Sequence, residues 1–230
     1  VSLMRYRIVG SIMPAVEMQL QAGESIYTQT GGMSWMSDGI LMNTNARGGF
    51  MKGLGRMFTG ESFFMTTYTS QRENAEIAFS STVPGEILPL DLRKYGSMIC
   101  QKGAFLCAQE QVTADAVFTK KLSSGLFGGE GFILQELRGN GMAFLEIDGN
   151  KVEKDLDPGE MIKVDTGNVV AFETSVSYDI EMVKGGMNMF LGGEGLFMTK
   201  LTGPGHVILQ TQNFSEFVGR IKQYIPTRND

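Results

Sequence analysis

One glycine-rich phrase occurs three times along the chain and constrains the fold more than any other feature. Two copies, at 128–134 and 192–198, share Gly-Gly-Glu-Gly followed by apolar residues, and a weaker copy, Thr-Gly-Glu-Ser-Phe-Phe-Met, lies at 59–65. Each copy follows a segment rich in Met, Leu or Phe and precedes a run that is typical of a strand. A phrase repeated in this way predicts a repeated structural unit.

Two further landmarks recur in the same order. A Gly-Glu turn ends an alternating polar and apolar run at 16–24 and at 152–160, and its middle copy is Pro-Gly-Glu at 84–86. A glycine that opens an apolar run lies at 32, 103 and 167, and the steps from it to the glycines at 60, 129 and 193 are 28, 26 and 26 residues. This regularity predicts one compact domain made of β units at 1–83, 84–157 and 158–213, followed by a C-terminal helix and tail at 214–230.

Within each unit the pattern is that of β-structure. Short apolar runs, such as 142–147 and 169–172, are bounded by Gly, Asp or Asn, and their length favours strands over helices. Glycine supplies 30 of the 230 residues, which suits a chain with many tight turns. We therefore expect an all-β protein whose three tandem units are related by a pseudo-threefold axis.

The C-terminal segment is the one stretch with a convincing helical pattern. Asn213 or Ser215 can cap it, Pro226 lies just beyond it, and apolar side chains recur at i, i+3, i+4 and i+7, namely Phe214, Phe217, Val218 and Ile221. We expect this helix to pack its apolar stripe against the β body.

The Gly-Glu phrases at 60, 129 and 193, together with Pro-Gly-Glu at 84–86 and 158–160, resemble the altered-inheritance-of-mitochondria family of uncharacterised bacterial proteins, which is similar to the tryptophan RNA-binding attenuator protein. The resemblance covers roughly residues 6–211. It implies three short double-stranded β-helix-like units and an oligomer. The family has no agreed enzymatic activity, so the resemblance implies a fold and leaves the function open.

No residue pattern predicts catalysis, a cofactor or a metal. A phosphate-binding loop would need Gly-Lys-Ser/Thr before a helix, whereas here Glu follows Gly and a strand follows Glu. His206 is the one histidine, and Cys100 and Cys107 have the spacing of small core residues rather than of a catalytic or metal site. We expect no enzyme activity that depends on these three residues.

The repeated glutamates allow two interpretations. Glu61, Glu130 and Glu194 occupy equivalent positions, and on a pseudo-threefold axis their carboxylates could meet at a hard cation. The simpler interpretation is that each carboxylate accepts backbone hydrogen bonds and pins its own glycine-rich loop. We expect loop pinning, and the same expectation applies to Glu24, Glu86 and Glu160.

The segments before the Gly-Glu phrases, at 50–58, 120–127 and 184–191, join a basic residue to glycine and bulky apolar side chains. Turns are usually polar, so these side chains are either packed inward or presented to a partner. They are our candidate interaction residues: Met51, Leu54, Met57, Phe58, Leu126, Phe127, Met189, Phe190 and Leu191. Because exposed rings drive association, we expect a homo-oligomer with at least one segment at the subunit contact.

The remaining function classes follow from charge and composition. The net charge of −5 argues against nucleic-acid binding by fold analogy. The chain shows neither a signal-peptide pattern nor an apolar run of spanning length, so we expect a cytoplasmic protein. The main hypothesis is a non-catalytic oligomeric scaffold or binding protein, and the alternative is peripheral attachment to a membrane surface through the Lys/Met/Phe loops.

Overall fold

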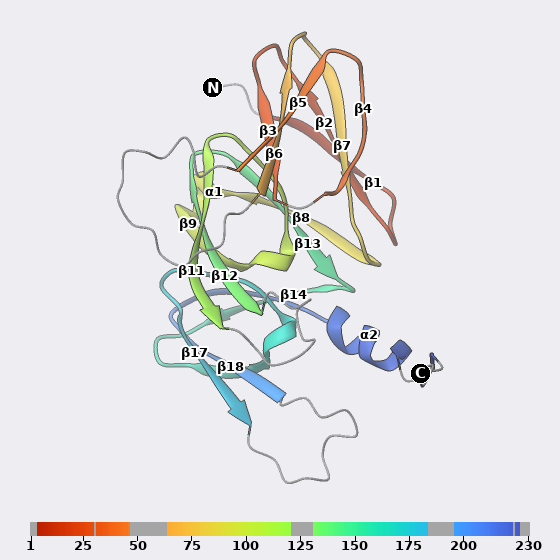
Figure 1. The fold of residues 1–230 in the computed structure, drawn as a ribbon. Helices are drawn as coiled ribbons and strands as arrows, with labels where there is room; N and C mark the ends of the chain where they lie inside the picture. Colours follow the sequence, from red (N-terminus) through yellow and green to blue (C-terminus); the bar gives the residue numbers. More distant parts are fainter. Residues whose placement is uncertain are drawn as a thin grey trace. The chain divides into compact units, whose positions relative to one another are not determined.

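The computed structural model describes residues 4–29, 31–46, 64–120, 131–183, 196–222 and 224–225 (Figure 1). These residues form several antiparallel sheets and a helix near the C-terminus, which confirms the predicted all-β class. Their contacts divide the chain into two compact units. The first unit consists of Val1–Lys94, Phe105–Thr113 and Gly139–Glu146, and the second of Tyr95–Ala104, Ala114–Arg138 and Ile147–Asp230.

The first unit contains a four-stranded and a six-stranded antiparallel sheet. The four-stranded sheet has the order β1 (Arg5–Val9), β2 (Ala15–Leu20), β7 (Ala75–Ser80) and β4 (Met33–Met36). The six-stranded sheet has the order β5 (Ile40–Ala46), β6 (Phe64–Ser70), β3 (Ser25–Thr28), β10 (Phe105–Gln109), β13 (Met142–Asp148) and β8 (Gly85–Asp91). A short helix, α1 (Leu92–Tyr95), follows β8.

The core of the first unit comes from period-2 alternation along these strands. On β2, Val16, Met18 and Leu20 are buried, while Gln19 between them is exposed. Their side chains pack in one apolar cluster with Phe79 of β7 and with residues of the six-stranded sheet. The edge-to-face contact between Tyr68 and Phe79, with ring centroids 5.6 Å apart, joins β6 to β7 in this cluster.

The second unit also contains two sheets. Its six-stranded sheet has the order β11 (Val112–Lys120), β12 (Phe132–Gly139), β9 (Ser97–Gln101), β16 (Val169–Glu173), β19 (Gly205–Gln210) and β14 (Lys151–Leu156). Its three-stranded sheet has the order β15 (Met161–Asp165), β18 (Leu196–Thr202) and β17 (Ser177–Val183). Two 3₁₀ turns, η1 (Lys102–Ala104) and η3 (Thr166–Asn168), lead into β10 and β16.

A separate apolar cluster forms the core of the second unit. It joins Phe132 and Leu134 of β12 to Phe172 of β16 and Leu201 of β18, all of them fully buried or nearly so. The ring of Tyr178 on β17 packs on Phe172, with centroids 5.4 Å apart. Each unit therefore has a hydrophobic core of its own.

The same irregularity in strand pairing occurs at three places along the chain. The register shifts between Met33 and Trp35 where β4 pairs with β7, between Phe105 and Cys107 where β10 pairs with β13, and between Val169 and Ala171 where β16 pairs with β19. A bulge inserts one residue into a ladder, so its recurrence is what a repeated unit predicts. The pseudo-threefold axis and the boundaries near residues 83 and 157 stay predictions.

Helix α2 (Phe214–Lys222) lies where the sequence predicts a helix. Asn213 is its cap, because its Oδ1 accepts hydrogen bonds from the backbone N–H groups of Ser215 (3.1 Å) and Glu216 (3.4 Å). The predicted packing of the helix is wrong: its four apolar side chains remain 43–46% exposed. No helix in the described part of the chain has the length and apolar character needed to cross a membrane.

Candidate functional site

The predicted interaction residues lie outside the described residues. This holds for Met51, Leu54, Met57, Phe58, Leu126, Phe127, Met189, Phe190 and Leu191, and equally for the predicted loop-pinning residues Glu61, Glu130 and Glu194. The described strands do show what each segment connects. Residues 47–63 join the paired strand ends Ala46 and Phe64, and residues 184–195 join Val183 and Leu196. Residues 121–130 join β11 to β12, which are also neighbours in their sheet.

Two of the other repeated glutamates pin their turns as predicted. The Glu24 carboxylate accepts a hydrogen bond from the backbone N–H of Gln21, and the Glu160 carboxylate accepts one from the N–H of Asp157, both at 2.8 Å. The first turn follows β2 and the second follows β14, so the two carboxylates stabilise equivalent turns of the repeat. Glu86 differs because it lies within β8 rather than in a turn.

His206 lies among carboxylates on one face of the second unit's six-stranded sheet. Its Nδ1 is 2.6 Å from Asp155 Oδ1, its Nε2 is 3.5 Å from Glu153 Oε1, and its backbone N–H donates to Glu173 Oε2 at 2.9 Å. The ring of Tyr95 stacks on the imidazole, with centroids 6.3 Å apart. His206 of β19 therefore contacts β14 through its ring and β16 through its backbone N–H.

The charges around His206 alter its acid–base behaviour. Burial opposes the charged form of the ring, but the hydrogen bonds and negative charges of Asp155 and Glu153 together outweigh it, so the pKa of His206 lies above its usual 6.5. The pKa of Glu153 is lowered in turn, chiefly by its hydrogen bond to Lys151. A protonated His206 on β19 therefore forms ion pairs with two carboxylates of β14.

The two cysteines are buried, which confirms their prediction as core residues. Burial raises the pKa of the Cys100 thiol to about 12, and that of Cys107 well above its usual value. Within the described ranges, no three side chains of His, Cys, Asp or Glu gather in a way that could hold a metal ion.

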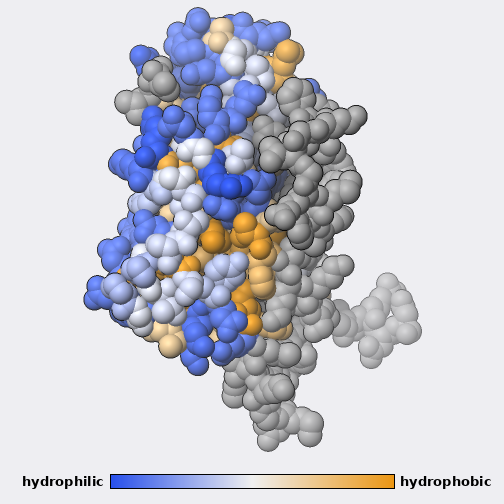
Figure 2. Space-filling view, turned by 90° about the vertical axis from the view of Figure 1, so that its left-hand side faces the viewer, coloured by the Kyte–Doolittle hydropathy of each residue, from blue (hydrophilic) through white to orange (hydrophobic). Residues whose placement is uncertain are grey.

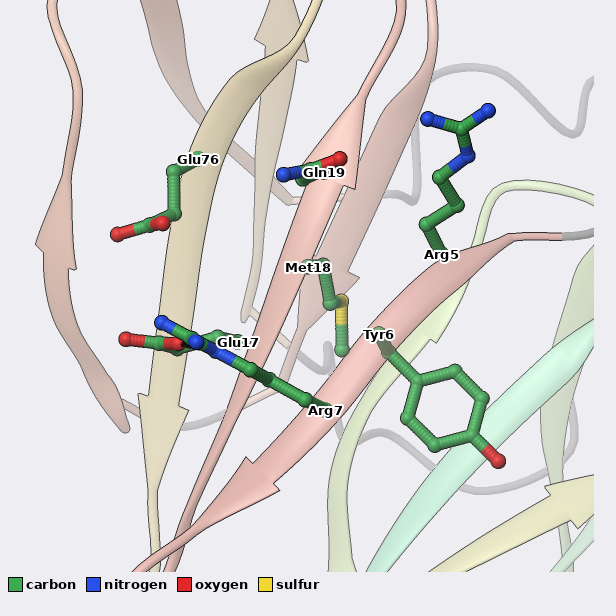
Figure 3. Close-up of a pocket in the computed structure, with 7 residues that line it drawn as sticks. All are labelled: Arg5, Tyr6, Arg7, Glu17, Met18, Gln19 and Glu76. Atoms are coloured by element: carbon green, nitrogen blue, oxygen red, sulfur yellow. Dashed lines mark hydrogen bonds and ion pairs between the residues drawn. The ribbon is translucent and has the colours of Figure 1, made fainter.

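A charged hollow lies on the four-stranded sheet of the first unit (Figure 3). It has a volume of about 290 Å³ and is lined from β1, β2 and β7 by Arg5, Tyr6, Arg7, Glu17, Met18, Gln19 and Glu76. Arg7 forms an ion pair with Glu17, which lies opposite it in the strand register. Figure 3 shows Arg7 extended over Glu17, with the Arg5 guanidinium pointing elsewhere, so the two arginines do not converge on one ligand.

Apolar side chains also reach the described surface. On α2 the exposed stripe consists of Phe214, Phe217, Val218 and Ile221, and Tyr224 and Ile225 follow it. Trp35 and Met36 of β4 are 42% and 38% exposed. Figure 2 shows one face on which hydrophobic residues reach the surface between hydrophilic ones. Such exposed apolar residues offer contact area to a partner, and we therefore take those of each unit as candidate functional residues.

Sequence reasoning missed two features, the charged hollow and the exposure of Trp35. The hollow depends on pairing between residues 5–7, 17–19 and 76, which are far apart in the chain, although the Arg-Tyr-Arg alternation of β1 is a visible signal. The exposure of Trp35 follows from its place on an edge strand, which only the strand order reveals. The stripe on α2 was found from its spacing, but its exposure was not.

The fold and surface define an all-β protein with exposed apolar contact residues. Comparison with known proteins narrows this class. Residues 6–212 match the family model described as mitochondrial biogenesis AIM24. An uncharacterised protein of Streptococcus pyogenes serotype M6 is 31% identical over 236 residues, covering 99% of this chain and 93% of that protein. A crystal structure of a Streptococcus pyogenes protein has a TM-score of 0.77 and 27% identity, covering 96% of this chain and all of the other.

The chain belongs to the AIM24 family, because the family model covers most of its length. This confirms the resemblance seen in the Gly-Glu phrases. The streptococcal relative is itself described as uncharacterised, so the family relation carries no activity over to this chain.

Proposed function

We propose that this protein is a non-catalytic oligomeric scaffold, which acts by non-covalent contact between its exposed apolar surfaces and neighbouring subunits. The observation that carries the proposal is the apolar stripe of α2, whose four side chains are each 43–46% exposed. A nine-residue helix with one apolar face gains most of its stability by covering that face.

The stripe has a substantial driving force for association. Full burial of a Phe, Val or Ile side chain is worth roughly 1.5–3 kcal/mol, so covering the exposed half of four such residues contributes several kcal/mol to a contact. Glu216 and Arg220 lie off the stripe, so the apolar face meets a like face without burying either charge. A second copy of the chain offers such a face, and closed homo-oligomers are the commonest soluble assemblies.

The proposal is tested by changing the stripe and leaving the rest of the helix intact. Phe217→Ser together with Ile221→Ser removes two of the four apolar side chains, and Arg220→Ser is the matched control on the polar face. We expect the stripe variant to have a lower molar mass than the wild type in light scattering at the same concentration, and the control to keep the wild-type mass. Both side chains are exposed, so we expect the unfolding midpoint of an isolated subunit to stay unchanged.

A stripe variant with the wild-type mass would contradict this role for α2. Peripheral membrane attachment depends on the Lys/Met/Phe loops, which lie outside the described residues, and it stays the alternative. Binding of the wild type to anionic vesicles, without self-association in solution, would favour that alternative over the scaffold.

A further inference from the structure

Each six-stranded sheet consists of two three-stranded blocks that meet edge to edge. In the first unit, the block β5-β6-β3 meets the block β10-β13-β8, with β3 and β10 paired at the junction. In the second unit, β11-β12-β9 meets β16-β19-β14, with β9 and β16 paired at the junction. The chain therefore makes the same kind of strand junction twice, antiparallel both times.

The two junctions also share one register. In the first, Ala108 lies opposite Tyr27, and in the second, Phe172 lies opposite Ile99. Ala108 and Phe172 are equivalent, because each follows by one residue the position where the register of its strand shifts. Tyr27 and Ile99 are each the third residue of their strand. The same strand pairing, in the same register, therefore occurs twice in this chain.

Two further blocks, β2-β7-β4 and β15-β18-β17, consist of equivalent strands but are not joined to another block in this way. Strand β4 ends the four-stranded sheet, and its register shifts between Met33 and Trp35, which makes Met36 the equivalent of Ala108 and Phe172. Strand β15 ends the three-stranded sheet. Among the described residues, neither strand has a neighbour on its outer side in these sheets.

The turn before β15 fixes its equivalence to β3. The backbone N–H of Gly23 donates to the carbonyl of Ser70, and the N–H of Ser70 donates to the carbonyl of Glu24. In the same way, the N–H of Gly159 donates to Gly203, and the N–H of Gly203 donates to Glu160. The first strand residue after the turn is Ser25 in one case and Met161 in the other. Lys163 is therefore the equivalent of Tyr27.

Side chains on the unpaired strand edges are more exposed than the equivalent side chains at the two junctions. Cys107 and Ala108 on β10, and Ala171 and Phe172 on β16, are completely buried at the junctions. The equivalent residues on β4, Trp35 and Met36, are 42% and 38% exposed. Lys163 on β15 is likewise exposed, whereas Tyr27 and Ile99 are buried. An exposed edge with apolar side chains is a template for another strand.

We propose that β4 of one copy pairs antiparallel with β15 of a second copy, with Met36 opposite Lys163, Trp35 opposite Val164 and Ser37 opposite Ile162. The occupant is a second copy because this chain carries both halves of a junction that it already forms twice. The inference rests on the proposed homo-oligomer, but it uses a different surface from α2. Since the two edges differ, the contact is head-to-tail and builds a ring or a filament.

The test uses two single-cysteine variants, Met36→Cys and Lys163→Cys, which are purified separately, mixed and oxidised mildly. Residues directly opposite each other in antiparallel strands have Cα atoms about 4.5–5.5 Å apart, which a disulfide can bridge. We expect a covalent dimer as the main product of the mixture and only background in either variant alone. The native Cys100 and Cys107 are buried and stay out of the reaction.

The matched control pairs Met36→Cys with Met161→Cys, which is two residues out of register on the same exposed strand. This pair places the Cα atoms beyond the roughly 7 Å limit for a disulfide, and we expect its mixture to yield only background. Equal dimer yields in the two mixtures would show contact without the proposed register and would overturn the inference. A disulfide that forms within single chains of the double variant Met36→Cys/Lys163→Cys at high dilution would also overturn it.

A second measurement uses the wild-type chain and does not depend on the cysteine variants folding. Trp35 is the one tryptophan of the sequence, so intrinsic tryptophan fluorescence reports on the β4 edge alone. We expect its emission to shift to shorter wavelength as concentration rises and subunits associate. If light scattering shows an oligomer but neither the cross-link nor the shift appears, the edge pairing is wrong and the scaffold proposal stands. If the wild type stays a monomer, both proposals fail.

Discussion

Glu146, on β13, is a buried carboxylate with a structural task in the first unit. Its Oε1 accepts hydrogen bonds from the backbone N–H of Thr82 (3.0 Å), the hydroxyl of Thr82 (2.6 Å) and the N–H of Val83 (3.2 Å). A buried charge is tolerated where such donors surround it. This one residue thereby holds the turn between β7 and β8.

Replacing Glu146 by Ala leaves those donors without their acceptor. We expect the free energy of unfolding to fall by about 3 kcal/mol, measured by urea denaturation. Glu146→Gln keeps an acceptor oxygen of the same size, and we expect a smaller loss, about 1 kcal/mol. Two variants of equal stability would mean that an acceptor oxygen at this position contributes nothing, which would contradict this role of Glu146.

His206 makes stability depend on pH. Its pKa in the folded chain is raised above the usual 6.5, so the folded state binds the proton more tightly than the unfolded state does. The stabilisation is complete below pH 6.5 and is lost as the pH rises through the folded-state pKa. We expect the unfolding free energy of the wild type, relative to that of His206→Gln, to decrease over this range.

The comparison with His206→Gln removes the contribution of every other titrating group. Urea denaturation of both proteins at a series of pH values between about 5.5 and 8.5 gives the difference directly. A difference that stays constant, or that increases with pH, would mean that Asp155 and Glu153 do not favour the charged ring.

At the scale of elements, helix α2 has a cap whose contribution can be measured separately. Asn213 Oδ1 caps the helix, and its Nδ2 also donates to Asp165 Oδ1 at 3.2 Å. We expect Asn213→Ala to lower the stability of the helix by about 1 kcal/mol, seen as faster hydrogen exchange of the α2 amides. Asn213→Ser retains a capping oxygen and should restore most of the protection; a failure to do so would assign the effect to the bond with Asp165.

The elements themselves were largely predictable from local sequence. The apolar runs at 142–147 and 169–172 became β13 and β16, and the i, i+3, i+4, i+7 spacing became α2. Local pattern identifies an apolar face but not what covers it, which is why the packing of α2 was predicted wrongly. The hollow around Arg7 and the open edge at Trp35 depend on long-range strand pairing, which no local pattern encodes.

At the scale of the whole molecule, the chain consists of two compact units, each with its own apolar cluster. In the described part of the chain, the edges of β4 and β15 have no neighbouring strand on their outer side, and the apolar stripe of α2 is exposed. We propose that self-association covers these surfaces, and this is our central claim.

The most direct test is the molar mass of the wild-type protein, measured by light scattering after size exclusion over a wide range of loading concentrations. We expect a mass that is a multiple of the 25.2 kDa chain and that falls toward it on dilution only if the contacts are weak. A monodisperse species of 25.2 kDa at every concentration would contradict the account.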